Sequence, residues 1–204
     1  MKKELIIIIS ISFMSFFGSV YAQKTFENKQ YEFVIEKPKN WIEANNEVLK
    51  KNLVKFDVSD ESLAKLIVDS KGSILLTSFY KYDPKTRAGL IPTIQINVRN
   101  KPVNDFEHFK SMIIQSSKGF KKVFEDFEFI EEVKEIEISE IKSVYFIGKF
   151  TMKGKNGQEM KVRSRTYAIP FKKYFFQVNF TDSQIDEDCS LEFDNLLKTI
   201  KVVL

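Results

Sequence analysis

Cysteine, histidine and glycine are scarce in this chain. Cys189 is the sole cysteine among 204 residues, so no intramolecular disulfide can form and a disulfide-stapled fold is excluded. His108 is the sole histidine, which rules out a metal site built from imidazoles and makes it the obligatory base of any Ser-His or Cys-His pair. Seven glycines leave little material for a loop that cradles phosphate. These absences count against most familiar enzyme sites.

Sequence motifs of catalysis are missing as well. The chain has no G-x-S-x-G elbow, no H-E-x-x-H pair, no Walker loop and no glycine pattern for a dinucleotide. We expect His108 to be an exposed or half-exposed side chain, and Cys189 to be a small buried residue at the start of the last helix. We therefore predict a protein that is not an enzyme and uses no cofactor. An envelope hydrolase with an unrecognised acidic or Cys-His site is the alternative.

The first 22 residues have the order of a secretory signal peptide. Lys2 and Lys3 precede an apolar run from Leu5 to Phe17. A cleavage site with small residues follows and ends at Ala22. We expect residues 1–22 to be removed and the mature protein to be exported, to the periplasm or out of the cell. Retention as a membrane anchor is the alternative, because Leu5 to Ala22 reaches the lower limit of length for a membrane span. No later run is apolar for long enough to cross a bilayer.

Residues 23–204 suit a single domain with an ordinary hydrophobic core. Twenty phenylalanines and seven tyrosines supply its bulk without help from disulfides or metal. The formal net charge of +4 is too small to indicate a partner by itself. Nucleic acid is not expected as a partner, because no aromatic-basic recognition motif is present.

Apolar periodicity predicts an α+β protein with a central antiparallel sheet flanked by helices. Strands are expected at residues 25–35 (a pair, with its turn at 27–29), 73–82, 92–99, 127–138, 141–153, 159–169 and 174–181. Helices are expected at 46–53, 59–72, 104–119 and about 185–198, followed by an apolar tail. Asn104 and Glu107 are predicted to cap the third helix, and Gly119 to end it. Its apolar stripe is predicted to comprise Phe106, Phe109, Met112, Ile113 and Ser116.

Three segments carry a resemblance to a known family. They are YEFVIEKPKNW at residues 31–41, PTIQINV at 92–98 and FDNLLKTI at 193–200. Together with the order of elements, they resemble the PsbP-like superfamily, the α+β fold of the extrinsic photosystem II protein and of a Ran-binding nuclear protein of the Mog type. The resemblance implies an antiparallel sheet with helices on its faces, and roles in binding or assembly. It marks no binding residue.

Acidic residues gather in two places. Asp182, Asp186, Glu187 and Asp188 gather at the start of the last predicted helix, where we expect them to interact with the helix dipole; their spacing lacks the glycine and distal glutamate of a calcium loop. A second run is expected on the solvated side of a strand, with a cation-binding surface as the alternative. It comprises Glu128, Glu131, Glu132, Glu135, Glu137 and Glu140.

The hairpin at 141–169 has one register that separates its two faces. A three-residue loop at 155–157, with Gly157 in the left-handed conformation, pairs Met152 with Met160 and Phe150 with Val162. Phe146 then faces Thr166, and Val144 faces Ala168. The opposite face is rich in cations and tyrosines, and we predict that it binds a partner. Its candidate residues are Tyr145, Lys149, Lys153, Lys161, Arg163, Arg165 and Tyr167.

Such a face suits an acidic protein, phosphates, acidic glycans or lipid headgroups, so a protein or an anionic envelope component is the predicted partner. Ion pairs with the neighbouring glutamate-rich strand are the alternative, since they would neutralise the face internally. A carrier for an apolar ligand held between sheet and helix is a further alternative. If the face binds a partner, reversing the charges of Arg163 and Arg165 is expected to weaken binding and leave the thermal melt nearly unchanged.

Overall fold

The computed structural model describes residues 24–44, 73–154 and 157–203. The predicted signal peptide and the two helices expected at 46–53 and 59–72 lie outside these residues. None of the helices in the described ranges combines the length and apolar character that a membrane crossing requires.

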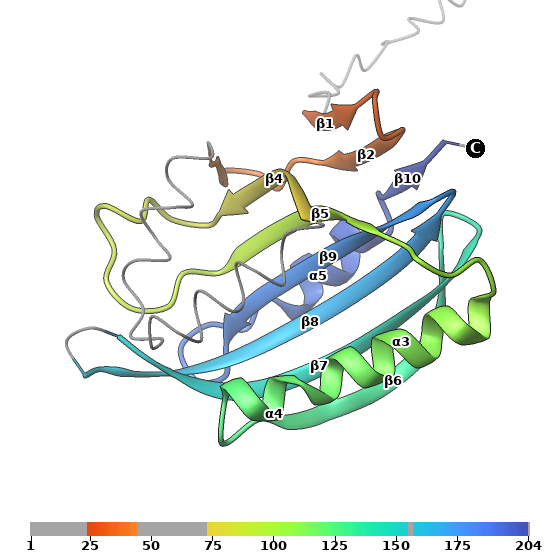
Figure 1. Cartoon of the computed structure of the whole chain (residues 1–204). Helices are drawn as coiled ribbons and strands as arrows, with labels where there is room; N and C mark the ends of the chain where they lie inside the picture. The colour runs from red at the N-terminus through yellow and green to blue at the C-terminus, as the bar shows by residue number, and fades with distance from the viewer. Residues whose placement is uncertain (1–23, 45–72, 155–156, 204) are drawn as a thin grey trace, which may run out of the picture.

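A seven-stranded antiparallel sheet forms the centre of the molecule (Figure 1). Its strands are β3 (Ile42–Glu43), β4 (Ser73–Tyr80), β5 (Thr93–Asn100), β6 (Glu128–Ile138), β7 (Ile141–Lys153), β8 (Glu159–Phe171) and β9 (Tyr174–Ser183). They lie in the order β3-β4-β5-β9-β8-β7-β6, and every pair of neighbours is antiparallel. The α+β class and the central antiparallel sheet are confirmed.

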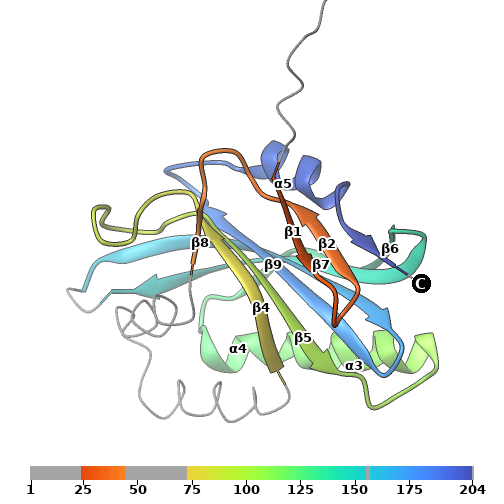
Figure 2. The same ribbon diagram turned by 90° about the horizontal axis from the view of Figure 1, so that it is seen from above.

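The two faces of this sheet carry different layers, as Figure 2 shows. Helices α3 (Phe106–Lys118) and α4 (Phe120–Val123) cover one face. Helix α5 (Ser190–Leu197) lies on the other, beside a small sheet of β1 (Thr25–Asn28), β2 (Phe33–Glu36) and β10 (Lys201–Val202). The small sheet pairs the start of the described chain with its end, which sequence patterns did not predict.

Aromatic side chains fill the core on both faces. On the α5 side, the rings of Phe180 and Phe193 stack with centroids 4.9 Å apart. On the α3 side, Phe109 meets Phe175 edge to face at 5.3 Å. Such offset and edge-on contacts add to the free energy gained from burial of apolar area.

Helix α3 differs from the prediction at its start. Asp105, not Asn104, is the N-cap residue, and its side chain accepts a hydrogen bond from the backbone N–H of His108. The helix thus begins one position later than the predicted cap implied, and Ser117 replaces Ser116 on the buried face. Gly119 caps the C-terminus as expected.

Helix α5 is shorter than predicted, because a hydrogen-bonded loop replaces its expected first turns. Ser183 Oγ accepts from the backbone N–H of Asp186 at 3.0 Å, and Asp182 Oδ2 accepts from that of Cys189 at 2.8 Å. These side chains hold the chain outside helical geometry until Ser190. Asp182, Asp186 and Glu187 therefore lie outside the first turn of α5, and the helix-dipole explanation for them is wrong.

The turn between β1 and β2 also lies later than predicted. Strand β1 continues through Asn28, so Glu27 and Asn28 belong to the ladder and the turn follows at residues 29–32. Asn28 Oδ1 accepts a hydrogen bond from the backbone N–H of Tyr31, which favours a turn at this later position.

Candidate functional site

The β7–β8 hairpin has the predicted register. Met152 pairs with Met160 and Phe150 with Val162, and Gly157 has a φ of 77° in the left-handed region. The seven candidate residues therefore share one face of the hairpin, here called the basic face. It is the face that lies on the side of α5.

Helix α5 covers the inner part of the basic face. Arg165 is 4% exposed, and its guanidinium lies 5.3 Å from the ring centroid of Phe193 on α5. It also donates a hydrogen bond to Ser190 Oγ at the start of the helix. Tyr167 is equally buried, and this burial raises the pKa of its phenol to about 12. Neither side chain is presented to solvent.

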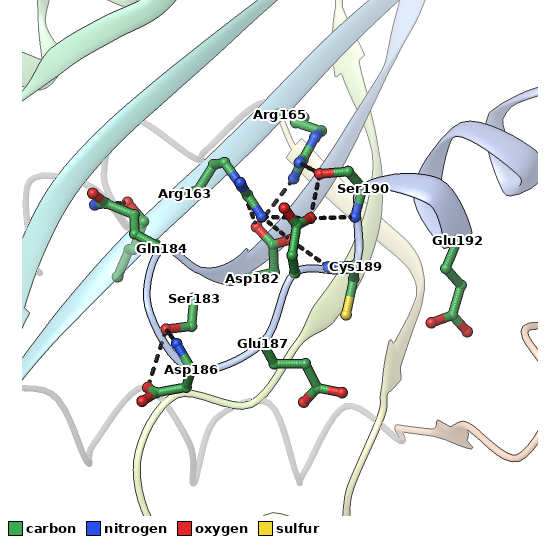
Figure 3. A network of polar contacts seen from close by, with 12 residues as sticks. Arg163, Arg165, Asp182, Ser183, Gln184, Asp186, Glu187, Cys189, Ser190 and Glu192 are labelled. Atoms are coloured by element: carbon green, nitrogen blue, oxygen red, sulfur yellow. Dashed lines mark hydrogen bonds and ion pairs between the residues drawn. The ribbon is translucent and has the colours of Figure 1, made fainter.

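Asp182 on β9 pairs with both arginines of the basic face, as Figure 3 shows, and Asp188 pairs with Arg163 as well. Arg163 binds Asp182 through two parallel hydrogen bonds, Nε to Oδ1 at 2.9 Å and Nη2 to Oδ2 at 2.8 Å. Arg165 Nη1 donates to Oδ1 at 3.0 Å. The bonds with Asp182 are the main reason that the pKa of Arg163 is raised above its ordinary value. These two candidate residues thus anchor β8 to β9 and to the start of α5.

Sequence reasoning missed this anchor, although a signal for it exists. Phe176, Val178 and Phe180 alternate on the face of β9 that packs against α5, and Asp182 is the next residue in that alternation. A carboxylate at an inward position needs a cation beside it, because an unpaired buried charge is costly. The adjacent strand supplies Arg163 directly opposite Asp182 and Arg165 diagonally from it.

The outer part of the basic face is exposed and weakly paired. Lys149 forms an ion pair of 2.8 Å with Glu128, and the two side chains are 42% and 67% exposed. Lys161 Nζ donates to Thr151 Oγ1 at 2.7 Å, and Lys153 is exposed. The predicted cross-strand ion pairing with β6 is thus present here. Lys149, Lys153 and Lys161 are called the hairpin end below.

Tyr145 joins the hairpin end to the buried part of the basic face. Its ring stacks on that of Tyr167 with centroids 5.7 Å apart. Its hydroxyl donates a 2.7 Å hydrogen bond to Glu131 on β6, and this bond is the main reason that the pKa of Tyr145 is raised.

A small hollow of about 200 Å³ opens at the hairpin end. It is lined by Asp126, Glu128, Lys149, Phe150, Lys161 and Gln184. Asp126 is fixed there by hydrogen bonds from the side chain and the backbone N–H of Thr151, which lower the pKa of its carboxyl. The Gln184 amide donates to Val162 O at 2.7 Å. The hollow thus combines cations and carboxylates. The side chains of Asp126 and Gln184 are fixed in its lining by hydrogen bonds to the backbone.

His108 and Cys189 lie on opposite faces of the sheet, on α3 and at the N-cap of α5 (Figure 2). The His108 side chain is 78% exposed, as expected. Cys189 is 2% exposed, and burial raises the pKa of its thiol to about 11. The Cys-His site, one of the two forms of the hydrolase alternative, is therefore not assembled. Among the described residues, no group of three or more His, Cys, Asp and Glu side chains is placed to hold a metal ion.

Lys81 forms a second polar cluster that sequence reasoning missed. Its Nζ lies 2.9 Å from Glu187 and 3.1 Å from Glu192, and Trp41 Nε1 donates to Glu192 at 2.8 Å. Burial alone would lower the pKa of Lys81, but its hydrogen bonds with the two glutamates outweigh burial and raise it. The cluster joins the residues after β4 to α5. Arg87 adds a second cation 4.0 Å from Glu187, whose Oε2 is buried and accepts no hydrogen bond from the described residues.

The sequence matches no protein-family model and none of the curated proteins. Three solved structures are similar in fold. A protein from Bacteroides thetaiotaomicron VPI-5482 has a TM-score of 0.49 at 13% identity, over 89% of this chain and 48% of its own. LpqN of Mycobacterium tuberculosis, described as involved in cell envelope biogenesis, has a TM-score of 0.43 at 15% identity, over 66% and 80%. Cyanobacterial PsbP (CyanoP) from Synechocystis sp. PCC 6803 has a TM-score of 0.49 at 11% identity, over 91% and 96%.

The chain spans about half the length of the Bacteroides protein. The similarity to CyanoP extends over nearly the whole chain. At these identities the likeness concerns the fold alone.

Proposed function

We propose that this is an exported, non-catalytic binding or assembly protein of the cell envelope, which contacts a partner through the hairpin end. The order of residues 1–22 supports export. The partner is a protein or an anionic component of the envelope, bound without a cofactor. Of the seven residues predicted to bind it, Lys149, Lys153 and Lys161 form the contact surface, and the half-buried Tyr145 lies at its inner limit.

The contrast between the two parts of the basic face carries this proposal. Arg163 and Arg165 are engaged by a fully buried carboxylate, and a partner would have to break a buried network to reach them. The ion pair of Lys149 with Glu128 is exposed, and such pairs contribute about 1 kcal/mol or less. Lysines at the hairpin end can therefore exchange an internal carboxylate for one on a partner at little cost.

Site-directed crosslinking in the native envelope tests the proposal. A photoreactive residue at position 149, 153 or 161 is expected to give a discrete crosslinked product. The matched control is position 118, an exposed lysine on α3 across the sheet. The double substitution Lys153→Glu and Lys161→Glu is expected to abolish the product formed from position 149, and Lys118→Glu to leave it intact. Equal products from positions 118 and 149 would contradict the proposed surface.

Charge reversal at Arg163 and Arg165 does not serve this purpose, contrary to the sequence-based expectation. A glutamate at position 165 would stand buried beside Asp182, with like charges in contact. The thermal melt is therefore expected to fall sharply, and lost binding would report lost folding.

A further inference from the structure

The hollow at the hairpin end has the size of a side chain. Its volume of about 200 Å³ lies below the range of roughly 300–1,000 Å³ that is usual for small-molecule sites. Its opening is flanked by two lysines on adjacent strands. Lys161 lies opposite Thr151, two residues along β7 from Lys149, so the two lysines are diagonal neighbours on one face. Two ammonium groups in this arrangement suit a single carboxylate between them.

Glu128 already supplies a carboxylate to Lys149, at 2.8 Å, and Asp126 lies 4.0 Å from Lys161. Glu128 is the first residue of β6, lies opposite Lys149 in the register, and is 67% exposed. By contrast, the carboxylate of Asp126 is held by the backbone and side chain of Thr151, and Gln184 is tied to backbone carbonyls. Asp126 and Gln184 are therefore fixed in the lining of the hollow, whereas the exposed carboxylate of Glu128 is free to turn outward.

We infer that a partner protein inserts an aspartate or glutamate side chain between Lys149 and Lys161, where it takes the place of Glu128. This inference rests on the proposed function and names the chemistry of its contact. When Glu128 turns outward, the hollow keeps two cations and one fixed carboxylate, so an incoming carboxylate restores its neutrality.

The charges around the hollow favour a protein over an anionic membrane. Asp126 and Glu128 line it, and Glu159 lies opposite Lys153 at the tip of the ladder. A lipid surface presents many anionic headgroups at once and would bring them against these carboxylates. A protein segment can place one carboxylate between the lysines and keep its other charges away.

Titration of the full protein with a defined peptide tests the inference. The probe is a blocked peptide of Gly-Ser-Glu repeats, followed through the backbone amide signals in NMR spectra, with Gly-Ser-Gln repeats as the uncharged control. The amides of Lys149, Lys161 and Gln184 are expected to shift with the acidic peptide only. Lys149→Gln and Lys161→Gln are each expected to weaken binding about two- to fivefold.

The decisive variant is Glu128→Gln, which removes the internal competitor. It is expected to tighten peptide binding about two- to fivefold. Glu132→Gln is the matched control, since it removes the same charge from an exposed position of β6 that has no ion pair with the described residues. Its effect is expected to stay within about 1.5-fold, as for a distant screened charge. Equal tightening by both variants would overturn the inference.

Vesicles of phosphatidylglycerol provide the competing arm. Binding to vesicles that depends on Lys149 and Lys161, without a response to the peptide, would overturn the inference and show that the ligand is a lipid surface. The proposed contact surface would still be supported by that result. Crosslinks from position 118 but none from the hairpin end would instead remove the proposed function and this inference together.

Discussion

Asp182 lies directly opposite Arg163 in the β8–β9 ladder and diagonally from Arg165, so one buried carboxylate pairs with two cations, and Asp188 supplies a second carboxylate to Arg163. The second oxygen of Asp182 also accepts the backbone N–H of Cys189. The same side chain therefore joins β8 to β9 and holds the chain at the start of α5.

Asp182→Asn is expected to destabilise the protein by about 3–5 kcal/mol, because it leaves the buried guanidinium of Arg165 without a counter-charge. Urea unfolding followed by circular dichroism measures the change. Glu128→Gln is the control, since it breaks an exposed pair and is expected to cost less than about 1 kcal/mol. Similar costs for the two variants would contradict a buried network.

Gly148→Ala is expected to destabilise the protein by about 1–3 kcal/mol through overpacking. A Cβ atom at this position would lie 2.5 Å from Cε2 and 2.7 Å from Cζ of Phe127, whose ring covers the glycine. Because the ring is the obstacle, Phe127→Leu in the same chain is expected to recover part of the loss. Double-mutant analysis of thermal melts checks this, and strict additivity of the two changes would be the contrary result.

The Cys189 thiol is expected to react with iodoacetamide at pH 8 roughly 100-fold more slowly than a free cysteine. Its pKa of about 11 leaves very little thiolate at that pH, and burial restricts access further. Mass spectrometry of timed samples measures the rate, with urea-unfolded protein as the control. Labelling of the folded protein at the unfolded rate would show that the loop before α5 opens readily.

Stability is expected to fall between about pH 4 and pH 2, in part through Asp188. Hydrogen bonds from Ser190, with a further contribution from Arg163, lower the pKa of Asp188 from 3.8 to about 2. A carboxyl whose folded-state pKa is lowered stabilises the protein above its unfolded pKa, and this contribution disappears as the pH falls through the folded value. For this exposed side chain it amounts to less than about 1 kcal/mol.

Comparison of the wild type with Asp188→Asn isolates this contribution. The difference in free energy of unfolding is expected to be constant above pH 4 and to shrink toward pH 2. A difference that does not change with pH would contradict the lowered pKa.

Alternation of side chains was sufficient to predict the hairpin, because a slip of one residue would have placed Met152 opposite Lys161 and mixed both faces. It was not sufficient to predict what covers the polar face. Arg165 has the same local pattern as Lys149, and only the position of α5, far along the chain, makes one buried and the other exposed. The start of α5 was misplaced for a related reason, since Asp182 and Ser183 hold the preceding loop through contacts that periodicity does not reveal.

The place of β9 at the middle of the large sheet has a consequence for biogenesis. Strands β4 and β5 are made early, and β6, β7 and β8 follow, yet the two groups meet only through β9, which is made near the end. The β3-β4-β5 and β8-β7-β6 parts of the large sheet are therefore joined only after residues 174–183 have been synthesised.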